Sequence, residues 1–242
     1  MGWVFISPHF DDAVLSCGGL IWEYSQAGIP VEIWTVTAGE PAAGPVSGLI
    51  TRIHTKWKTG SPAETVALRR IEDQKAAQLV GASVRHLGLV DAIYRRTNNG
   101  LYLYTEDVFD PIHPEESGII EETARLISRE LKASDTLVCP LALGGHVDHV
   151  IVRAAIESLG LPIFYYTDIP YLFEHQDELP AATSNMISRH ISVSTEGLAA
   201  WQDGIEAYES QLPSLFLDSQ EMRNLIQDYC SLNHGQLIWK KL

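Results

Sequence analysis

The sequence predicts an α/β protein with a single doubly wound, mostly parallel sheet of the Rossmann-like type and helices on both faces. Short apolar runs, typical of strands buried on both faces, alternate with segments whose apolar residues recur at helical spacing. That alternation favours parallel strands joined by helices. The 242 residues, 45% of them hydrophobic, are enough to bury one large core. No internal repeat or linker divides them, so we expect one domain over residues 1–242.

The composition argues against several classes of protein. With 17 basic and 31 acidic residues, the formal net charge of −14 disfavours binding to nucleic acid or to an anionic membrane through a general basic surface. No apolar run approaches the roughly 20 residues that span a bilayer, and the N-terminus lacks the basic region of a signal peptide. The odd number of cysteines, Cys17, Cys139 and Cys230, is typical of reduced thiols. We therefore expect a soluble cytoplasmic protein, and a homo-oligomer stays open.

The first strand, expected over residues 3–6, leads directly into a cluster of polar side chains. Pro8 ends this strand because proline has no amide hydrogen for the ladder. One imidazole, His9, and two carboxylates, Asp11 and Asp12, then follow within four residues. These are side chains that divalent metals accept as ligands.

The next elements continue the alternation of helix and strand. A helix is expected over residues 14–27, where Gly18 and Gly19 indicate close packing of the helix backbone against the sheet. A second buried strand follows over residues 31–36. Both elements fit the start of a parallel sheet.

Residues 41–60 are predicted to form a long irregular segment, because glycine and proline interrupt it repeatedly. A loop of about 20 residues in a compact domain is usually functional or disordered. The segment carries basic and aromatic side chains in an otherwise acidic protein: Arg52, His54, Lys56, Trp57 and Lys58. Two interpretations stay open, a solvated loop and a lid that touches the substrate.

The helix that follows begins with a capping box, in which Ser61 is the N-cap and Glu64 the third helical residue. In the irregular stretch 92–113, Asn99-Gly100 indicates a small hairpin. The other elements are expected as helices ending near residue 80 and over 114–131, 149–159, 195–209 and 218–231, strands over 84–87, 136–139, 163–166 and 187–193, and a short apolar tail.

A second polar cluster follows the strand over 136–139. Gly145 lets the backbone turn closely before His146, Asp148 and His149. In an open α/β sheet, the loops after the carboxyl ends of strands converge where the strand order reverses. We expect this convergence to bring His149 and the first cluster's His9 and Asp12 onto one ion.

Two imidazoles and one carboxylate suit a catalytic zinc ion and leave a coordination position open for water. Zinc lowers the pKa of a bound water from about 15.7 to about 7, which supplies hydroxide at neutral pH. The same donor set also holds Fe²⁺, so the identity of the metal stays open.

The two clusters resemble the motifs of the PIG-L (LmbE-like) family of metal-dependent de-N-acetylases. The family's Ala-His-Pro-Asp-Asp-Glu is similar to Pro8-His9-Phe10-Asp11-Asp12-Ala13, and its His-X-Asp-His to His146-Val147-Asp148-His149. Weaker similarities follow in order at residues 37–40, 70–81, 87–91 and 210–211, so the resemblance spans roughly residues 3–211. Phe10 and Ala13 stand where the family has Pro and Glu, which changes the wall of the pocket.

The resemblance implies a role for each matching residue. It assigns His9, Asp12 and His149 to the metal, and it makes Asp11 the general base. His146 becomes the general acid or the oxyanion stabiliser, and we expect Asp148 to orient His146 and keep it charged. Arg70 and Asp91 would contact the sugar, although Arg69 lies beside Arg70. Structural alternatives stay open: a helix N-cap for Asp11, an N-cap or surface salt bridge for Asp148, and a surface ion pair for Arg70.

The resemblance therefore implies a zinc-dependent N-deacetylase, a hydrolase of linear amides that acts on an N-acetylated amino sugar such as an N-acetylglucosaminide. Two alternatives stay open. One is an amidase acting on a thiol-sugar conjugate. The other is a metal- or sugar-binding protein without turnover, prompted by Ala13. The presence of Asp11 and His146, which a pure binding protein would not need, disfavours the second alternative.

Overall fold

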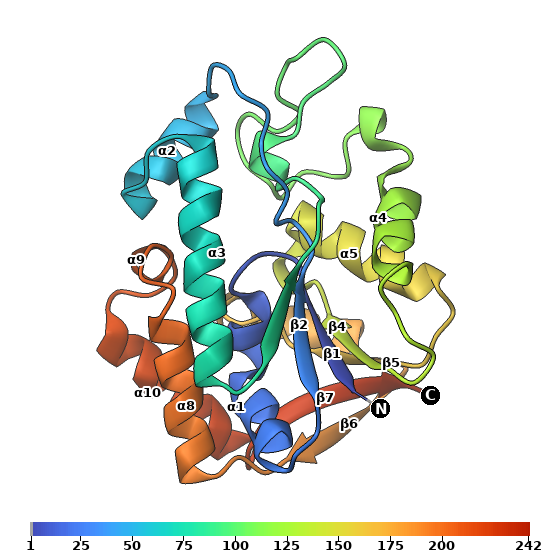
Figure 1. The fold of residues 1–242 in the computed structure, drawn as a ribbon. Helices are drawn as coiled ribbons and strands as arrows, with labels where there is room; N and C mark the ends of the chain where they lie inside the picture. Colours follow the sequence, from blue (N-terminus) through green and yellow to red (C-terminus); the bar gives the residue numbers. More distant parts are fainter. Residues whose placement is uncertain (1) are drawn as a thin grey trace.

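The computed structural model describes residues 2–242, which contain a seven-stranded sheet in the order β3-β2-β1-β4-β5-β7-β6 (Figure 1). Strands β3 to β5 in this order are parallel, and β7 runs antiparallel to both of its neighbours. This confirms the predicted fold class. The strands are β1 (Trp3–Ser7), β2 (Val31–Thr35), β3 (Ser83–His86), β4 (Thr136–Pro140), β5 (Ile163–Tyr166), β6 (Met186–Ile191) and β7 (Gln236–Lys241).

Helices cover both faces of the sheet (Figure 1). One face carries α1 (Asp12–Gln26), α3 (Pro62–Leu79), α8 (Thr195–Glu206) and α10 (Ser219–Leu232), and the other carries α4 (Ile119–Ser128) and α5 (Val147–Ser158). The shorter helices are α2 (Gly48–Trp57), α6 (Tyr171–Glu174), α7 (Leu179–Ala182) and α9 (Leu212–Leu215), with single turns of 3₁₀ helix at η1 (Ala92–Tyr94), η2 (Pro114–Glu116), η3 (Leu143–Gly145) and η4 (Gln176–Glu178).

The glycine pair in α1 serves helix packing and not, as expected, the approach of the helix to the sheet. A Cβ atom on Gly18 would lie 2.3 Å from the indole of Trp201, and one on Gly19 would lie 3.0 Å from the same ring. The buried Trp201 also donates its indole hydrogen to the carbonyl of Val14 at 2.8 Å. Helices α1 and α8 can therefore pack closely only because these two positions lack a side chain.

Part of the segment 41–60 is helical, contrary to the prediction of an irregular loop. Helix α2 begins after Ser47, whose hydroxyl accepts a hydrogen bond from the backbone N–H of Ile50 at 3.1 Å. Its apolar residues Leu49, Ile50 and Ile53 recur at helical spacing. Gly48, which reads as an interruption in the sequence, is the first helical residue, where a glycine costs little because it lies at the end.

The last strand was also missed. Residues 236–241, expected as a short apolar tail, form β7 between β5 and β6. The side chain of Gln236 is fully buried, and its carbonyl accepts a hydrogen bond from the backbone N–H of Leu20 at 2.7 Å. Other predicted elements are confirmed with shifted ends; the helix expected from residue 114, for instance, begins at Ile119 after a 3₁₀ turn.

The strand order places the two polar clusters next to each other. Strand β1 pairs with β2 on one side and with β4 on the other, so the connections that leave β1 and β4 diverge to opposite sides of the sheet. The loop after β1 carries the first cluster, and the turn between β4 and α5 carries the second. Among residues 2–242, no helix combines the length and apolar character needed to cross a bilayer.

Candidate metal centre and active-site pocket

The loop after β1 is held in shape by its own polar groups. The hydroxyl of Ser7 donates to the carbonyl of His9 at 2.6 Å and accepts from the backbone N–H of Ala13 at 3.0 Å. The backbone N–H of His9 donates to a carboxylate oxygen of Asp12 at 2.6 Å. These bonds turn the chain tightly from strand to helix and fix the Asp12 carboxylate beside the His9 ring.

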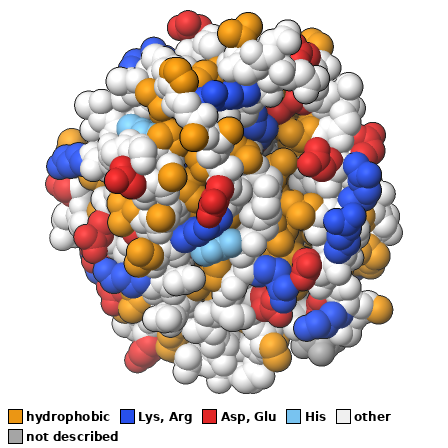
Figure 2. All heavy atoms as spheres, turned by 45° about the horizontal axis from the view of Figure 1, so that its top comes forward, with side chains coloured by type: hydrophobic (Ala, Val, Ile, Leu, Met, Phe, Trp, Pro, Cys, Tyr) orange, Lys and Arg blue, Asp and Glu red, His pale blue; other side chains and the backbone are white. Residues whose placement is uncertain are grey.

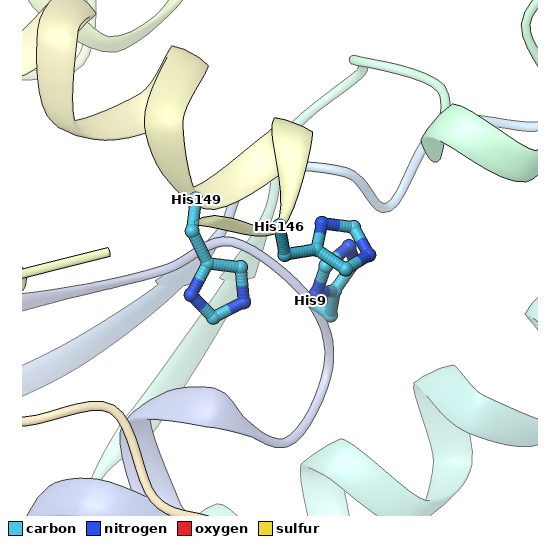
Figure 3. A group of neighbouring side chains, drawn as sticks. All are labelled: His9, His146 and His149. Carbon is cyan, nitrogen blue, oxygen red and sulfur yellow. The ribbon is translucent and has the colours of Figure 1, made fainter. Parts of the chain in front are cut away.

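The structure brings together the three side chains that the sequence assigns to a metal. Nδ1 of His9 lies 3.2 Å from one oxygen of Asp12, and Nε2 of His149 lies 3.3 Å from the other. All three residues are buried. Figure 3 shows the His9 ring, from the loop after β1, close to His146 and His149 at the start of α5.

A buried carboxylate stands behind each of the two imidazoles that face Asp12. Nε2 of His9 lies 3.1 Å from Asp148, and Nδ1 of His149 lies 2.7 Å from Asp168. Because an ionised carboxylate only accepts hydrogen bonds, each of these ring nitrogens carries a hydrogen. When the two rings are neutral, the opposite nitrogens, Nδ1 of His9 and Nε2 of His149, therefore carry the lone pairs, as in a metal site whose histidines are held by outer carboxylates.

The donor set fits a divalent cation. The buried Nε2 atom of His149 has no hydrogen-bond partner among the described residues, although it points towards Asp12. A cation between the two free imidazole nitrogens and the carboxylate of Asp12 would satisfy this atom. Nitrogen and carboxylate donors suit zinc, and they suit Fe²⁺ as well.

The charges around these imidazoles raise their affinity for protons. Burial lowers the pKa of His149, but the carboxylates of Asp12 and Asp168 outweigh burial and raise that pKa to about 9. Burial also lowers the pKa of His9, and hydrogen bonds to Asp12 and Asp148 outweigh it and raise that pKa well above 6.5. A cation that binds here must therefore displace protons.

His146 is placed differently from the other two histidines. Ligand atoms of His9, His146 and His149 lie within 4.8 Å of one another, so His146 could be taken for a third ligand. However, Nδ1 of His146 accepts a hydrogen bond from the backbone N–H of Asp148 at 3.2 Å. The hydrogen of the neutral ring is therefore on Nε2, which makes this atom a hydrogen-bond donor into the pocket.

The expected pairing of Asp148 with His146 is wrong. The carboxylate of Asp148 instead accepts hydrogen bonds from the ring of His9, the guanidinium of Arg95 and the backbone N–H of Ala92. Burial lowers the pKa of His146 well below 6.5, and the neighbouring His9 lowers it further. His146 is thus a neutral imidazole and is not kept charged. A second group with ligand atoms within 4.8 Å, His9, Asp91 and Asp148, is less suited to a metal because Asp148 already holds Arg95 and His9.

The carboxylate of Asp11 lies in the pocket beside Arg69. It occupies the N-cap position of α1, but its side chain makes no capping hydrogen bond. Burial raises the pKa of Asp11 to about 6, against the opposing charge of Arg69, whose guanidinium nitrogen lies 3.6 Å away. A carboxylate with this pKa can both accept and return a proton near neutral pH.

Arg69, and not Arg70, faces the site. The side chain of Arg70 reaches the carbonyl of Ala38 and the exposed Glu40, outside the pocket. Arg69 is only 4% exposed and lies 3.6 Å from Asp11 and 3.7 Å from Asp91. The two arginines are adjacent in the sequence, and only the rotation of α3 about its axis determines which of them faces the pocket.

Arg69 is also clamped between two aromatic rings. Its guanidinium carbon lies 5.1 Å from the centre of the Phe10 ring and 4.7 Å from that of Trp57. Phe10 stands where the related family has proline, and Trp57 is the last residue of α2. The aromatic residue of segment 41–60 therefore contacts the site through an arginine, which favours the interpretation of this segment as part of the substrate pocket.

A pocket of about 300 Å³ opens over these side chains. Besides the polar residues already described, Gln211 and Ser214 reach it from the C-terminal third of the chain. Much of its wall is apolar or aromatic: Ile53, Trp57, Ile93, Val108, Phe109, Tyr171 and Leu215. On the face of the molecule shown in Figure 2, hydrophobic side chains lie between scattered acidic and basic ones.

Sequence reasoning missed several residues of the site. Asp168 follows strand β5 at the same edge of the sheet as His9, so the sequence allowed it either in the pocket wall or in the core, but its contact with His149 was not predicted. Gln211 lines the pocket, and its only signal was the weak family similarity at residues 210–211. Arg95 had no signal, because it lies in an irregular segment and supports the site only through the packing of that segment.

Comparison with known proteins identifies similar sequences and similar folds. The profile of the PIG-L family, described as GlcNAc-PI de-N-acetylase, matches residues 4–159. A 2'-N-acetylparomamine deacetylase from Niallia circulans is 30% identical over 98% of this chain and 89% of its own length. The crystal structure of the zinc-inhibited form of a teicoplanin deacetylase covers the whole chain, and 98% of that structure is matched, with a TM-score of 0.85 and 27% identity. The crystal structure of a deacetylase of the A40926 pseudoaglycone matches 99% of this chain and 96% of its own length, with a TM-score of 0.77 and 28% identity.

Proposed function

The chain belongs to the PIG-L family of GlcNAc-PI de-N-acetylases, and we propose that the acetyl group it removes is carried by an amino sugar linked to a larger aglycone. Its relatives include deacetylases of 2'-N-acetylparomamine, of teicoplanin and of the A40926 pseudoaglycone. The apolar wall around the pocket, with Trp57, Phe109 and Tyr171, supports this proposal because it offers contact area beyond the reacting amide.

The observation that carries the proposal is the convergence of His9, Asp12 and His149 at one edge of the pocket, with the buried Nε2 of His149 unpaired. In the proposal these three residues hold one zinc ion. Zinc supplies Lewis acidity that polarises the amide carbonyl and acidifies a water. Asp148 and Asp168 hold the two imidazoles from behind.

Asp11 then acts as the base for the attacking water. Its carboxylate is free of capping bonds, and with a pKa of about 6 it is largely ionised at neutral pH. Once protonated, Asp11 can return the proton to the amide nitrogen, which must be protonated because an amine anion is a poor leaving group. In this proposal Asp11 takes the acid role, which was one of the two roles that the resemblance implied for His146.

His146 stabilises the negative charge that develops on the carbonyl oxygen. Its Nδ1 atom is held by a backbone N–H, which leaves the hydrogen on Nε2 facing the pocket. A neutral donor that is fixed before the reaction loses no energy to reorganisation when the charge forms. The lowered pKa of His146 is consistent with this role.

Arg69 and Asp91 bind the sugar in this proposal. They form an ion pair at 3.7 Å on the wall of the pocket, so together they offer donors and acceptors to neighbouring hydroxyls. Arg70 has no such role. We also propose a cytoplasmic location, which the three free cysteines support.

The direct test is acetate release by the zinc-loaded enzyme from a graded series of N-acetylated compounds: N-acetylglucosamine, 2'-N-acetylparomamine and an N-acetylglucosaminyl glycopeptide. We expect turnover of at least one of the two larger compounds and slower turnover of the free sugar. His149→Ala should abolish turnover, whereas Lys75→Ala, which removes an exposed ion pair with Glu209 outside the pocket, should not. Faster release from free N-acetylglucosamine than from either larger compound would contradict the proposed aglycone.

A further inference from the structure

A chain of buried polar side chains runs from the metal centre into the segment that follows β3. Asp148 is fully buried, and its two oxygens divide their contacts. One oxygen accepts from Nε2 of His9 at 3.1 Å and from the backbone N–H of Ala92 at 2.9 Å. The other oxygen accepts from the guanidinium of Arg95.

On the side away from Asp148, Arg95 is held by Glu116 and by a backbone carbonyl. Its Nε atom lies 2.5 Å from one oxygen of Glu116, and the hydroxyl of Tyr104 donates to the other oxygen at 2.6 Å. A guanidinium nitrogen of Arg95 also donates to the carbonyl of Val90 at 3.1 Å. Arg95, Glu116 and Tyr104 are 7%, 7% and 3% exposed, so water competes little for these contacts.

We propose that Arg95 is a positioning residue for the metal site, because it fixes Asp148 in the orientation that keeps the hydrogen of His9 on Nε2 and leaves Nδ1 free for the cation. This inference rests on the metal site of the proposed function. Arg95 touches neither the metal ligands nor the substrate side of the pocket, and it acts through Asp148 alone.

The physical reason lies in the buried charge of Asp148. A carboxylate that is fully shielded from water needs a cation at a fixed position beside it. The planar guanidinium of Arg95 meets this need because it can bond Asp148 and Glu116 at the same time. A lysine ammonium is a compact charge on a flexible stem and has no such fork. In Arg95→Lys the charge would remain but the carboxylate could rotate, so that His9 could exchange its tautomer and turn away from Asp12.

The experiment measures binding of zinc alone, by competition with a chromophoric chelator, and the visible absorption of the cobalt-substituted protein. Arg95→Lys should weaken zinc binding roughly 10- to 100-fold, the usual effect of losing an outer partner of a ligand, and should shift the cobalt bands. Arg85→Lys is the matched control, since Arg85 also lies between two carboxylates, Glu32 and Glu130, but outside the site. The control should leave both measurements unchanged.

Parent affinity and an unshifted cobalt spectrum in Arg95→Lys would overturn the inference. If Arg95→Lys does not fold, Tyr104→Phe takes its place: it removes the hydroxyl that donates to Glu116 and accepts from the backbone N–H of His113. A several-fold weaker zinc affinity is expected, and parent affinity in that variant would overturn the inference equally. The zinc titration of the parent protein separates the two proposals. A parent that binds no stoichiometric zinc removes the metal site itself, whereas a parent that binds zinc while Arg95→Lys binds it equally well removes only the role of Arg95.

Discussion

Replacing Trp57 with leucine tests whether helix α2 belongs to the substrate site. The indole lies 4.7 Å from the guanidinium carbon of Arg69, and the side chain of Arg69 is almost completely removed from water. A cation–π contact contributes about 0.5–1 kcal/mol at an exposed site and about 2 kcal/mol when desolvated. Leucine keeps the helical preference of the position, so the change removes the aromatic face and leaves the fold of α2 intact.

From a loss of about 1–2 kcal/mol we expect kcat/KM to fall roughly 5- to 30-fold, since each 1.4 kcal/mol is about a tenfold change. The loss should come mainly from a higher KM, because Arg69 in the proposal binds the sugar while Asp11 performs the chemistry. The assay is steady-state acetate release over a range of substrate concentrations. Tyr102→Leu is the matched control: Tyr102 stacks on Arg96 at 4.4 Å, away from the pocket. A Trp57→Leu enzyme with the parent KM and kcat would refute the placement of α2 against the substrate.

Three further predictions concern the base, the outer carboxylate and pH. Asp11→Asn should lower kcat by about 10²–10⁴-fold while zinc affinity, measured by chelator competition, stays near that of the parent; retained turnover would remove Asp11 as the base. Asp168→Asn should weaken zinc binding roughly 10- to 100-fold, because an amide can donate to Nδ1 of His149 and so shift the ring hydrogen of His149 to Nε2. Asp73→Asn changes another buried carboxylate that is bonded to a histidine, and it should leave zinc binding unchanged. His149 has a folded-state pKa of about 9, above its ordinary 6.5, so it contributes stability that is complete below about pH 6.5 and is lost as the pH rises through 9. Chelator-treated protein should therefore melt at a lower temperature at pH 9.5 than at pH 7 in calorimetry, and a rising melting temperature over that interval would contradict the assigned partners.

The sequence by itself determined the parallel part of the sheet, β1 to β5, and the strand ends that lead into the site, although it did not predict β7. Apolar runs before His9 and before His146 are strands because buried parallel strands need no polar face. Proline and glycine mark where these strands end. Since the carboxyl ends of parallel strands share one edge, the loops with His9, Asp12 and His149 had to meet if β1 and β4 were neighbours, and the structure has them so.

Only the tertiary structure decided which side chains support that edge. Arg69 and Arg70 are adjacent in sequence, and the rotation of α3 against the sheet turns one into the pocket and the other outward. The side chain of Asp148 contacts His9 and not His146, because its buried carboxylate is paired with the guanidinium of Arg95. Arg95 lies in a segment that has neither helical nor strand periodicity. Such choices depend on distances between residues far apart in the chain. The local sequence pattern determines whether a segment is a helix or a strand. Packing between these elements determines which of their side chains point into the site, and the chemistry of the site depends on that orientation.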